Sequence, residues 1–254
     1  MKSHIKKWLG PANIQLLKDY LGSSESPEIF QKRVRFYNQI IGKYDTYFDV
    51  GANFGNRVAV MLHIGCRVIA VDPQSECCKY LRKKYGQRIT VIEKGAGAEI
   101  GQKEFFISDA TTISTFATDW IQAVKQSGRF GGHDWQKKVM VQLTTLDALI
   151  QEVGLPRFIK IDVEGYELEV LQGLTQMVDY LSFEYTVPEQ TNKLLMCIRH
   201  IRDIGQGKVL FNYSQGESME WALPNWLSAE EAILLIESQE FLKTNFGDIY
   251  ARKA

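Results

Sequence analysis

Short apolar runs alternate with amphipathic segments along most of the chain. Seven of these runs are predicted to be strands, at residues 46–50, 67–71, 88–92, 157–161, 180–185, 208–213 and 248–253. The intervening segments repeat apolar residues at helical spacing, as at Leu168, Leu171 and Leu174. Continuous apolar strands separated by amphipathic helices are typical of a mostly parallel sheet that is covered on both faces. The pattern therefore predicts an α/β fold.

The 254 residues suit one large domain, and we expect residues 1–254 to form a single domain with two additions. Residues 1–42 are predicted to be an N-terminal helical appendage. Its start, "MKSHIKKWLG", favours a short amphipathic helix that docks on the domain, with a membrane-surface contact as the alternative. The stretch "GSSESPE" at 22–28 is predicted to be a linker.

The second addition separates the third and fourth predicted strands. Residues of about 99–145 are predicted to form an inserted hairpin and a lid, with 103–107 and 138–143 as the strand pair. An insertion of this length in a compact domain is usually functional. A hairpin without a function is the alternative.

Composition narrows the class of protein. Formal net charge is zero, 45% of the residues are hydrophobic and 24% are charged, so no global basic field points to a nucleic-acid partner. We expect none. No apolar run has the length of a transmembrane segment, and the N-terminus lacks the features of a signal peptide. The four cysteines form no C-x-x-C pair, which favours a reducing, cytoplasmic location.

A glycine pair directly follows the first predicted strand, in "YFDVGANFGN". Gly51 and Gly55 lie between a strand and a helix, which is the context of a nucleotide-binding turn, although the full G-x-G-x-x-G fingerprint is absent. Asp72 ends the second strand about twenty residues further on, where a carboxylate would accept hydrogen bonds from both hydroxyls of a ribose. A plain turn, with Asp72 as a helix N-cap, is the alternative.

Asp49 lies two residues before Gly51 and bears on the choice of nucleotide. Its charge would repel the pyrophosphate of NAD in a low-dielectric crevice. S-adenosylmethionine has no phosphate and carries a sulfonium and an ammonium, which Asp49 would attract. Backbone N–H groups at the start of the following helix suit that ligand's carboxylate. A structural hydrogen bond from Asp49 to the turn is the alternative.

Several motifs together resemble the FkbM-type methyltransferase family. They are "FDVGANFGN", "VDP", "TLDAL", "IKIDVEGYELEVLQG" and "FEY", in matching order between about Tyr47 and Tyr185. The resemblance implies a class I, Rossmann-like methyltransferase with a seven-stranded, mostly parallel sheet, its last strand antiparallel. It also implies S-adenosylmethionine as the methyl donor and a hydroxyl acceptor on a sugar, glycan or natural product. Many members carry a threonine in the first helix turn, where this chain has Arg57 and Val58.

The motifs and the resemblance give the predicted donor site. It comprises the strand-end acid, the glycine loop, the ribose acid with its proline, and a small segment after the third strand near the adenine: Asp49, Gly51, Ala52, Asn53, Phe54, Gly55, Asp72, Pro73, Ala96, Gly97 and Ala98.

The predicted catalytic residues are Asp162 and His133. Asp162 ends the fourth strand beside the first, so it would lie in the same crevice as Asp49 and serve as the general base for a hydroxyl. As the alternative, Asp162 and Glu164 fix the turn, with Lys160 as an ion-pair partner. His133, in "GGHDW", would act as the base if its loop closed over the acceptor; a solvated loop histidine is the alternative.

Asp162 and Glu184 would end adjacent strands, and their oxygens would suit Mg²⁺. Two carboxylates do not make a site, so no metal is predicted.

The sequence thus predicts an S-adenosylmethionine-dependent O-methyltransferase acting on a small molecule or glycan. A non-catalytic nucleotide-binding module and an NAD(P)-dependent oxidoreductase are the alternatives. The acceptor and the oligomeric state do not follow from the sequence.

Overall fold

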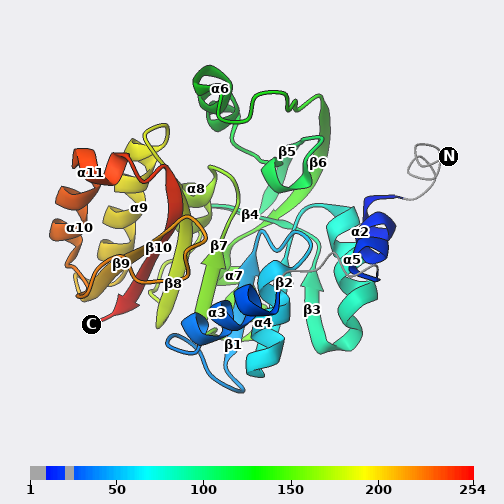
Figure 1. The fold of residues 1–254 in the computed structure, drawn as a ribbon, viewed down its shortest axis with the longest axis horizontal. Helices are drawn as coiled ribbons and strands as arrows, with labels where there is room; N and C mark the ends of the chain where they lie inside the picture. The colour runs from blue at the N-terminus through cyan, green and yellow to red at the C-terminus, as the bar shows by residue number, and fades with distance from the viewer. Residues whose placement is uncertain (1–9, 21–25) are drawn as a thin grey trace.

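A seven-stranded sheet runs through the middle of the fold (Figure 1). The computed structural model describes residues 10–20 and 26–254. Strand order is β3-β2-β1-β7-β8-β10-β9; neighbours from β3 to β8 pair in parallel, and β10 is antiparallel to β8 and β9. This confirms the predicted fold class. The strands are β1 Thr46–Val50, β2 Arg67–Val71, β3 Ile89–Ile92, β7 Phe158–Ile161, β8 Tyr180–Thr186, β9 Val209–Gln215 and β10 Phe246–Lys253.

Helices cover both faces of the sheet, which explains why its strands are continuously apolar. Side chains alternate along a strand, so Tyr47 and Phe48 of β1 are both fully buried but belong to different hydrophobic clusters. The helices are α2 Pro11–Tyr20, α3 Pro27–Tyr37, α4 Asn56–Ile64, α5 Ser75–Tyr85, α6 Thr118–Ser127, α7 Leu146–Val153, α8 Glu167–Gln172, α9 Thr191–Ile204, α10 Ala229–Ile236 and α11 Gln239–Leu242. Residues of α3, α4 and α5 pack on one face, and residues of α7 to α10 on the other.

The N-terminal segment is more than an appendage. Ser26 caps α3 by accepting a hydrogen bond from the backbone N–H of Ile29, and the last turn of that helix buries Phe36 and Tyr37. The ring of Phe36 contacts Trp221 and Tyr250, and that of Tyr37 contacts Phe158, so α3 belongs to the core cluster on its face. The predicted amphipathic helix at the start falls on residues 1–9, and most of the predicted linker on 21–25; both lie outside the described residues.

The insertion forms a second, three-stranded sheet in the order β4-β6-β5. Its strands are β4 Gly95–Ala96, β5 Gly101–Ile107 and β6 Lys137–Thr144, and β5 pairs with β6 in antiparallel fashion as predicted. Helix α6 lies above this sheet in Figure 1. Its Trp120 is 1% exposed, and the ring fits so closely over the turn after β7 that a Cβ on Gly165 would lie 2.4 Å from it. The insertion is therefore anchored by apolar packing.

None of the helices that the structure describes has the length and apolar character required to cross a membrane.

Candidate active site

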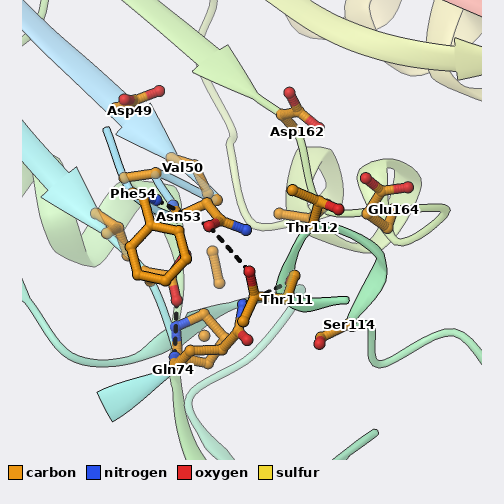
Figure 2. Close-up of a pocket in the computed structure, with 18 of the residues that line it drawn as sticks. Asp49, Val50, Asn53, Phe54, Gln74, Thr111, Thr112, Ser114, Asp162 and Glu164 are labelled. Atoms are coloured by element: carbon orange, nitrogen blue, oxygen red, sulfur yellow. Dashed lines mark hydrogen bonds between the residues drawn. The ribbon is translucent and has the colours of Figure 1, made fainter. Parts of the chain in front are cut away.

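A cavity of about 430 Å³ opens where β1, β2 and β7 end (Figure 2). Ligands of open α/β sheets bind at this edge, beyond the carboxyl ends of the strands. Its walls come from the turns after β1, β2 and β7, from the segment after β3, from the insertion, and from single residues of α2 and of the turn after β9. Most of the predicted donor residues and Asp162 therefore line one pocket.

The turn after β1 depends on glycine. Gly51 has a φ of +87°, and a Cβ there would lie 1.8 Å from the backbone oxygen of Asp162. The close approach of this turn to the end of β7 is therefore possible only without a side chain. Gly55 then caps α4 with a φ of +76° and supplies no side-chain hydrogen bond, which leaves the first N–H groups of α4 to other partners.

Asp72 holds two turns together at the end of β2. Its Oδ2 accepts a hydrogen bond of 2.7 Å from the N–H of Asn53, and its Oδ1 accepts one of 2.7 Å from the N–H of Gln74. Gln74, and not Asp72, is the N-cap residue of α5. Each carboxylate oxygen keeps a further lone pair for a ligand. Burial raises the pKa of Asp72 to about 7 against the opposing effect of these two hydrogen bonds.

Asp49 lies at the end of β1 with 3% of its surface exposed. Its Oδ1 accepts a hydrogen bond of 3.0 Å from the hydroxyl of Tyr47, so its partner is a residue of the same strand and not the glycine turn. Burial raises the pKa of Asp49 to about 6, although Lys160 and Tyr47 act in the opposite direction. A cationic ligand would favour the ionised form of this buried carboxyl.

Lys160 and Asp162 form an ion pair at the end of β7, as the two-residue period of a strand allows. Lys160 Nζ lies 2.7 Å from Asp162 Oδ2 and 3.4 Å from Asp248 Oδ1, and the lysine side chain is only 3% exposed. Burial raises the pKa of Asp162, but the charge and hydrogen bond of Lys160 outweigh it, so that pKa lies below its usual value.

Asp162 of this pair also belongs to a cluster of three carboxylates. Oxygens of Asp162, Glu164 and Glu184 lie within 4.8 Å of one another. Glu164 has a φ of +55°, a strained conformation for a non-glycine residue, and such strain is concentrated at functional sites. Desolvation and the neighbouring acids raise the pKa values of Glu164 and Glu184 well above the usual range. The cluster therefore binds protons more readily than isolated carboxylates do.

Glu167 fixes the turn that presents Glu164. Its Oε1 accepts hydrogen bonds from the backbone N–H groups of Val163 and Gly165, at 3.1 and 3.2 Å. Burial raises the pKa of Glu167 to about 7. The turn-fixing role that the sequence offered for Asp162 and Glu164 thus belongs to Glu167.

The insertion closes one side of the pocket. Thr111, Thr112 and Ser114 line it (Figure 2), and the Thr111 hydroxyl lies 3.5 Å from Asn53 Oδ1. His133 is placed elsewhere. Its Nδ1 lies 2.9 Å from Asp109 Oδ1, its side chain is 41% exposed, and it is not among the residues that line this pocket. The structure does not bring His133 to the predicted acceptor site.

Most of the predicted donor residues line the pocket: Asp49, Gly51, Ala52, Asn53, Phe54, Asp72, Pro73 and Ala96. Gly55, Gly97 and Ala98 do not. Gly55 is turned toward Leu81 as the cap of α4, Gly97 packs against Leu143, and Ala98 is exposed. The segment after β3 contributes to the wall two residues earlier than predicted, through Lys94, Gly95 and Ala96.

Sequence reasoning missed several contributors to the wall, four of which stand out. Gln15 of α2, Arg57 of α4 and Glu217 of the turn after β9 line the pocket, as does Lys94. Arg57 was detectable in the sequence, because many members of the family carry a threonine in the first turn of this helix, where this chain has Arg57 and Val58. Gln15 and Glu217 had none, because both come from segments without a recognisable motif.

The sheet order, the glycine turn and the acid at the end of β2 define a class I, S-adenosylmethionine-dependent methyltransferase. Residues 49–200 match the family profile of the methyltransferase FkbM domain. The match covers more than half of the chain, so the chain belongs to the FkbM methyltransferase family. This excludes the NAD(P)-dependent oxidoreductase that the sequence left open.

Solved structures with a similar fold are distant. A TehB-like SAM-dependent methyltransferase from Corynebacterium glutamicum is 8% identical, with a TM-score of 0.49 and all of both chains covered. A precorrin-6y C5,15-methyltransferase from Geobacter metallireducens is 11% identical, with a TM-score of 0.44 over 87% of this chain and 86% of the other. A Streptococcus mutans protein in complex with SAH is 12% identical, with a TM-score of 0.41 over 91% and 99%. No curated protein matches this chain.

The pocket fits the donor that the family uses. The turn at Gly51 leaves no room for a side chain, and the buried carboxyl of Asp72 lines the pocket with lone pairs available for ribose hydroxyls. The pKa of Asp49 is raised by burial, and a nearby cation would relieve this. A cavity of about 430 Å³ is within the usual range for a site of this kind.

Proposed function

We propose that this methyltransferase transfers the methyl group to a hydroxyl oxygen of a sugar-bearing acceptor. The observation that carries the proposal is the cluster of Asp162, Glu164 and Glu184 in the donor pocket. A hydroxyl is a poor nucleophile until a base removes its proton, and carboxylates with raised pKa values are suited to that task.

Bound S-adenosylmethionine supplies a methyl group on a positively charged sulfur. The part of this chain is to orient the acceptor and remove its proton. Asp162 extends from the end of β7 and is held by Lys160, so it can accept a hydrogen bond from the acceptor hydroxyl in a fixed direction. The proton passes to the cluster, in which Glu164 and Glu184 have the higher proton affinity.

These separate roles of Asp162 and the cluster refine the prediction that Asp162 is the general base. Lys160 lowers the pKa of Asp162, and a lowered pKa weakens a general base. The three carboxylates titrate together, so the proton belongs to the cluster and not to one residue. In the proposed mechanism Asp162 orients the hydroxyl and Glu164 is the first candidate for the final proton acceptor.

The charge of the pocket supports a neutral acceptor. Three cations line it, Arg57, Lys94 and Lys160, against six carboxylates: Asp49, Asp72, Asp162, Glu164, Glu184 and Glu217. A phosphate-rich acceptor would meet net repulsion here. We therefore propose no nucleic-acid substrate for this pocket.

A surface groove beside the pocket supports a sugar. It is lined by the rings of Tyr213, Trp221 and Phe246 and by the amides of Gln215 and Asn245. Gly216 and Ser218 line this groove while Glu217, between them, lines the pocket, so the two are adjacent. Sugar rings pack their C–H faces on aromatic rings and hydrogen-bond to polar side chains through their hydroxyls.

The test is a methyl-transfer screen with S-adenosylmethionine against pooled neutral glycans and small alcohols, read by mass spectrometry. Pools of amines and of RNA oligonucleotides serve as the matched alternatives. The proposal expects a mass gain of one methylene on a glycan or alcohol. Transfer confined to the amine pool would overturn the hydroxyl acceptor, and transfer confined to the RNA pool would overturn the neutral acceptor; neither outcome would affect the assignment to the family.

A further inference from the structure

Arg57 lies in the first turn of α4 and is one of the buried cations of the donor pocket. The residue is 7% exposed and lines the cavity. Its guanidinium contacts Glu217, with one terminal nitrogen 2.8 and 2.7 Å from the two carboxylate oxygens. Its Nε is buried and has no hydrogen-bond partner among the described residues. The guanidinium thus has a donor group that no described residue uses.

The partner of Arg57 is unusual for so buried a charge. Glu217 lies in the turn after β9, its side chain is 57% exposed, and it also contacts Arg33 at 3.1 Å. Lys160, the other deeply buried cation of the pocket, is held by two acids of the sheet. Arg57 is therefore the buried cation whose carboxylate can be exchanged with little rearrangement of the core.

Asp49 gives the same end of the pocket an opposite charge. It lies near the end of β1, Arg57 lies in the first turn of the helix that follows, and both line the cavity. The hydrogen bond of Asp49 goes to Tyr47, and that of Arg57 goes to Glu217. Arg57 acts to lower the pKa of Asp49, which shows that their charges interact. A carboxylate and a guanidinium that line the same pocket are complementary to a zwitterion.

The start of α4 adds to the positive side of this arrangement. Gly55 provides no side-chain cap, so the first N–H groups of the nine-residue helix add their partial positive charge to that of Arg57. Lys94 also lines the pocket, but it follows β3, which is separated from β1 by β2. The amino-acid end of the donor, with its ammonium and carboxylate on one carbon, matches Asp49 and Arg57.

We propose that Arg57 binds the carboxylate of the donor's amino-acid end, and that this carboxylate displaces Glu217 from the guanidinium. Glu217 then keeps Arg33 as its partner. Because Gly216 and Ser218 on either side of Glu217 line the aromatic groove, donor binding would shift the wall of the acceptor groove. The inference rests on the donor site of the proposed function and is independent of the acceptor.

Calorimetry with two ligands tests the proposal. S-adenosylhomocysteine, the demethylated donor, carries the carboxylate, and 5′-methylthioadenosine lacks the whole amino-acid end. Arg57→Met keeps much of the side-chain volume and removes the charge. The substitution should weaken the binding of S-adenosylhomocysteine about 10- to 150-fold, the usual range for a lost charged hydrogen bond. It should change the affinity for methylthioadenosine by less than about twofold. Equal weakening of both ligands, or of neither, would overturn the proposal.

Arg33→Met is the matched control. Arg33 pairs with the same carboxylate but is not among the residues that line the pocket. The ratio of the two dissociation constants should stay within about twofold of the parent. A loss of preference as large as that of Arg57→Met would assign the effect to the turn that carries Glu217, and the proposal would fail.

Glu217→Gln provides a second test that does not depend on the folding of a variant in the core. Removing the competing carboxylate should strengthen the binding of S-adenosylhomocysteine several-fold and leave the affinity for methylthioadenosine unchanged. An unchanged or reduced ratio would contradict the displacement of Glu217. A parent protein that bound neither ligand would instead overturn the donor-site assignment itself.

Discussion

Lys160 Nζ lies 2.7 Å from Asp162 Oδ2, so the carboxylate nearest the end of β7 is held by a buried cation of its own strand. This pair fixes the direction of Asp162 and lowers its pKa, while Glu164 and Glu184 beside it have raised pKa values. The site thus combines one carboxylate suited to orienting a hydroxyl with two suited to holding a proton.

Asp162→Asn should retain S-adenosylhomocysteine affinity within about threefold and lower the methyl-transfer rate by about two to four orders of magnitude. The amide keeps the shape of the side chain, but the cluster loses one of its charges. Glu164→Gln should show a loss of similar size if Glu164 receives the proton. The rates are measured with the acceptor found in the screen.

Two outcomes would change this assignment. Normal turnover of a folded, donor-binding Asp162→Asn would place the acceptor elsewhere in the pocket. Loss of activity of the parent protein in a chelator, restored by Mg²⁺, would make the three carboxylates metal ligands instead of a proton-accepting cluster.

Gly51→Ala should destabilise the protein by more than about 3 kcal/mol, because a Cβ at this position would lie 1.8 Å from the Asp162 backbone oxygen at a positive φ. Gly101→Ala is the control, since a Cβ there has no atom within 4 Å. Denaturant unfolding of the two variants measures the difference. Equal free energies of unfolding would contradict the close approach of the glycine turn to β7.

Donor affinity should rise with pH between about pH 5 and pH 7 and then level off. Burial raises the pKa of Asp72 to about 7 and that of Asp49 to about 6, and the ligand interacts with their ionised forms. Each group contributes up to about tenfold in affinity per pH unit below its pKa. The contribution of Asp72 to folding stability has the opposite sign: it is largest at low pH and is lost as pH rises through about 7.

Methylthioadenosine separates the two groups. It keeps the ribose proposed for Asp72 but lacks the ammonium proposed for Asp49, so its affinity should depend on pH less steeply below about pH 6 than that of S-adenosylhomocysteine. Identical pH profiles for the two ligands would contradict the role proposed for Asp49.

Residues 108–117 should exchange their amide hydrogens more slowly when S-adenosylhomocysteine is bound. Thr111, Thr112 and Ser114 line the pocket, and a bound ligand would restrict the opening of this segment. Residues 128–134 should exchange faster than α6, since this loop is mostly exposed while α6 buries Trp120 and Val124. Mass spectrometry reads both effects, and unchanged exchange at 108–117 would separate the insertion from the donor site.

The strands were predictable because a buried parallel strand is a continuous apolar run. β1 and β2 have the predicted bounds, and the ends of these two strands and β7 placed Asp49, Asp72 and Asp162 at one edge. The contribution of Glu217 was not predictable, because it depends on how the turn after β9 is placed beside the ends of β1 and α4, which no local pattern in the sequence gives. His133 and Ala98 were predicted to belong to the site but do not line the pocket, because the sequence gives no direction for a side chain in a loop.

Calorimetry of S-adenosylhomocysteine with the parent protein and with Asp72→Ala tests the central assignment most directly. We expect the parent to bind and the variant, if folded, to bind about 10- to 150-fold more weakly, because the ribose hydroxyls lose a charged acceptor. Asn53 and Gln74 also lose an acceptor for their N–H groups in this variant, so its thermal unfolding is measured alongside. A folded Asp72→Ala that binds S-adenosylhomocysteine as tightly as the parent would contradict the donor site described here.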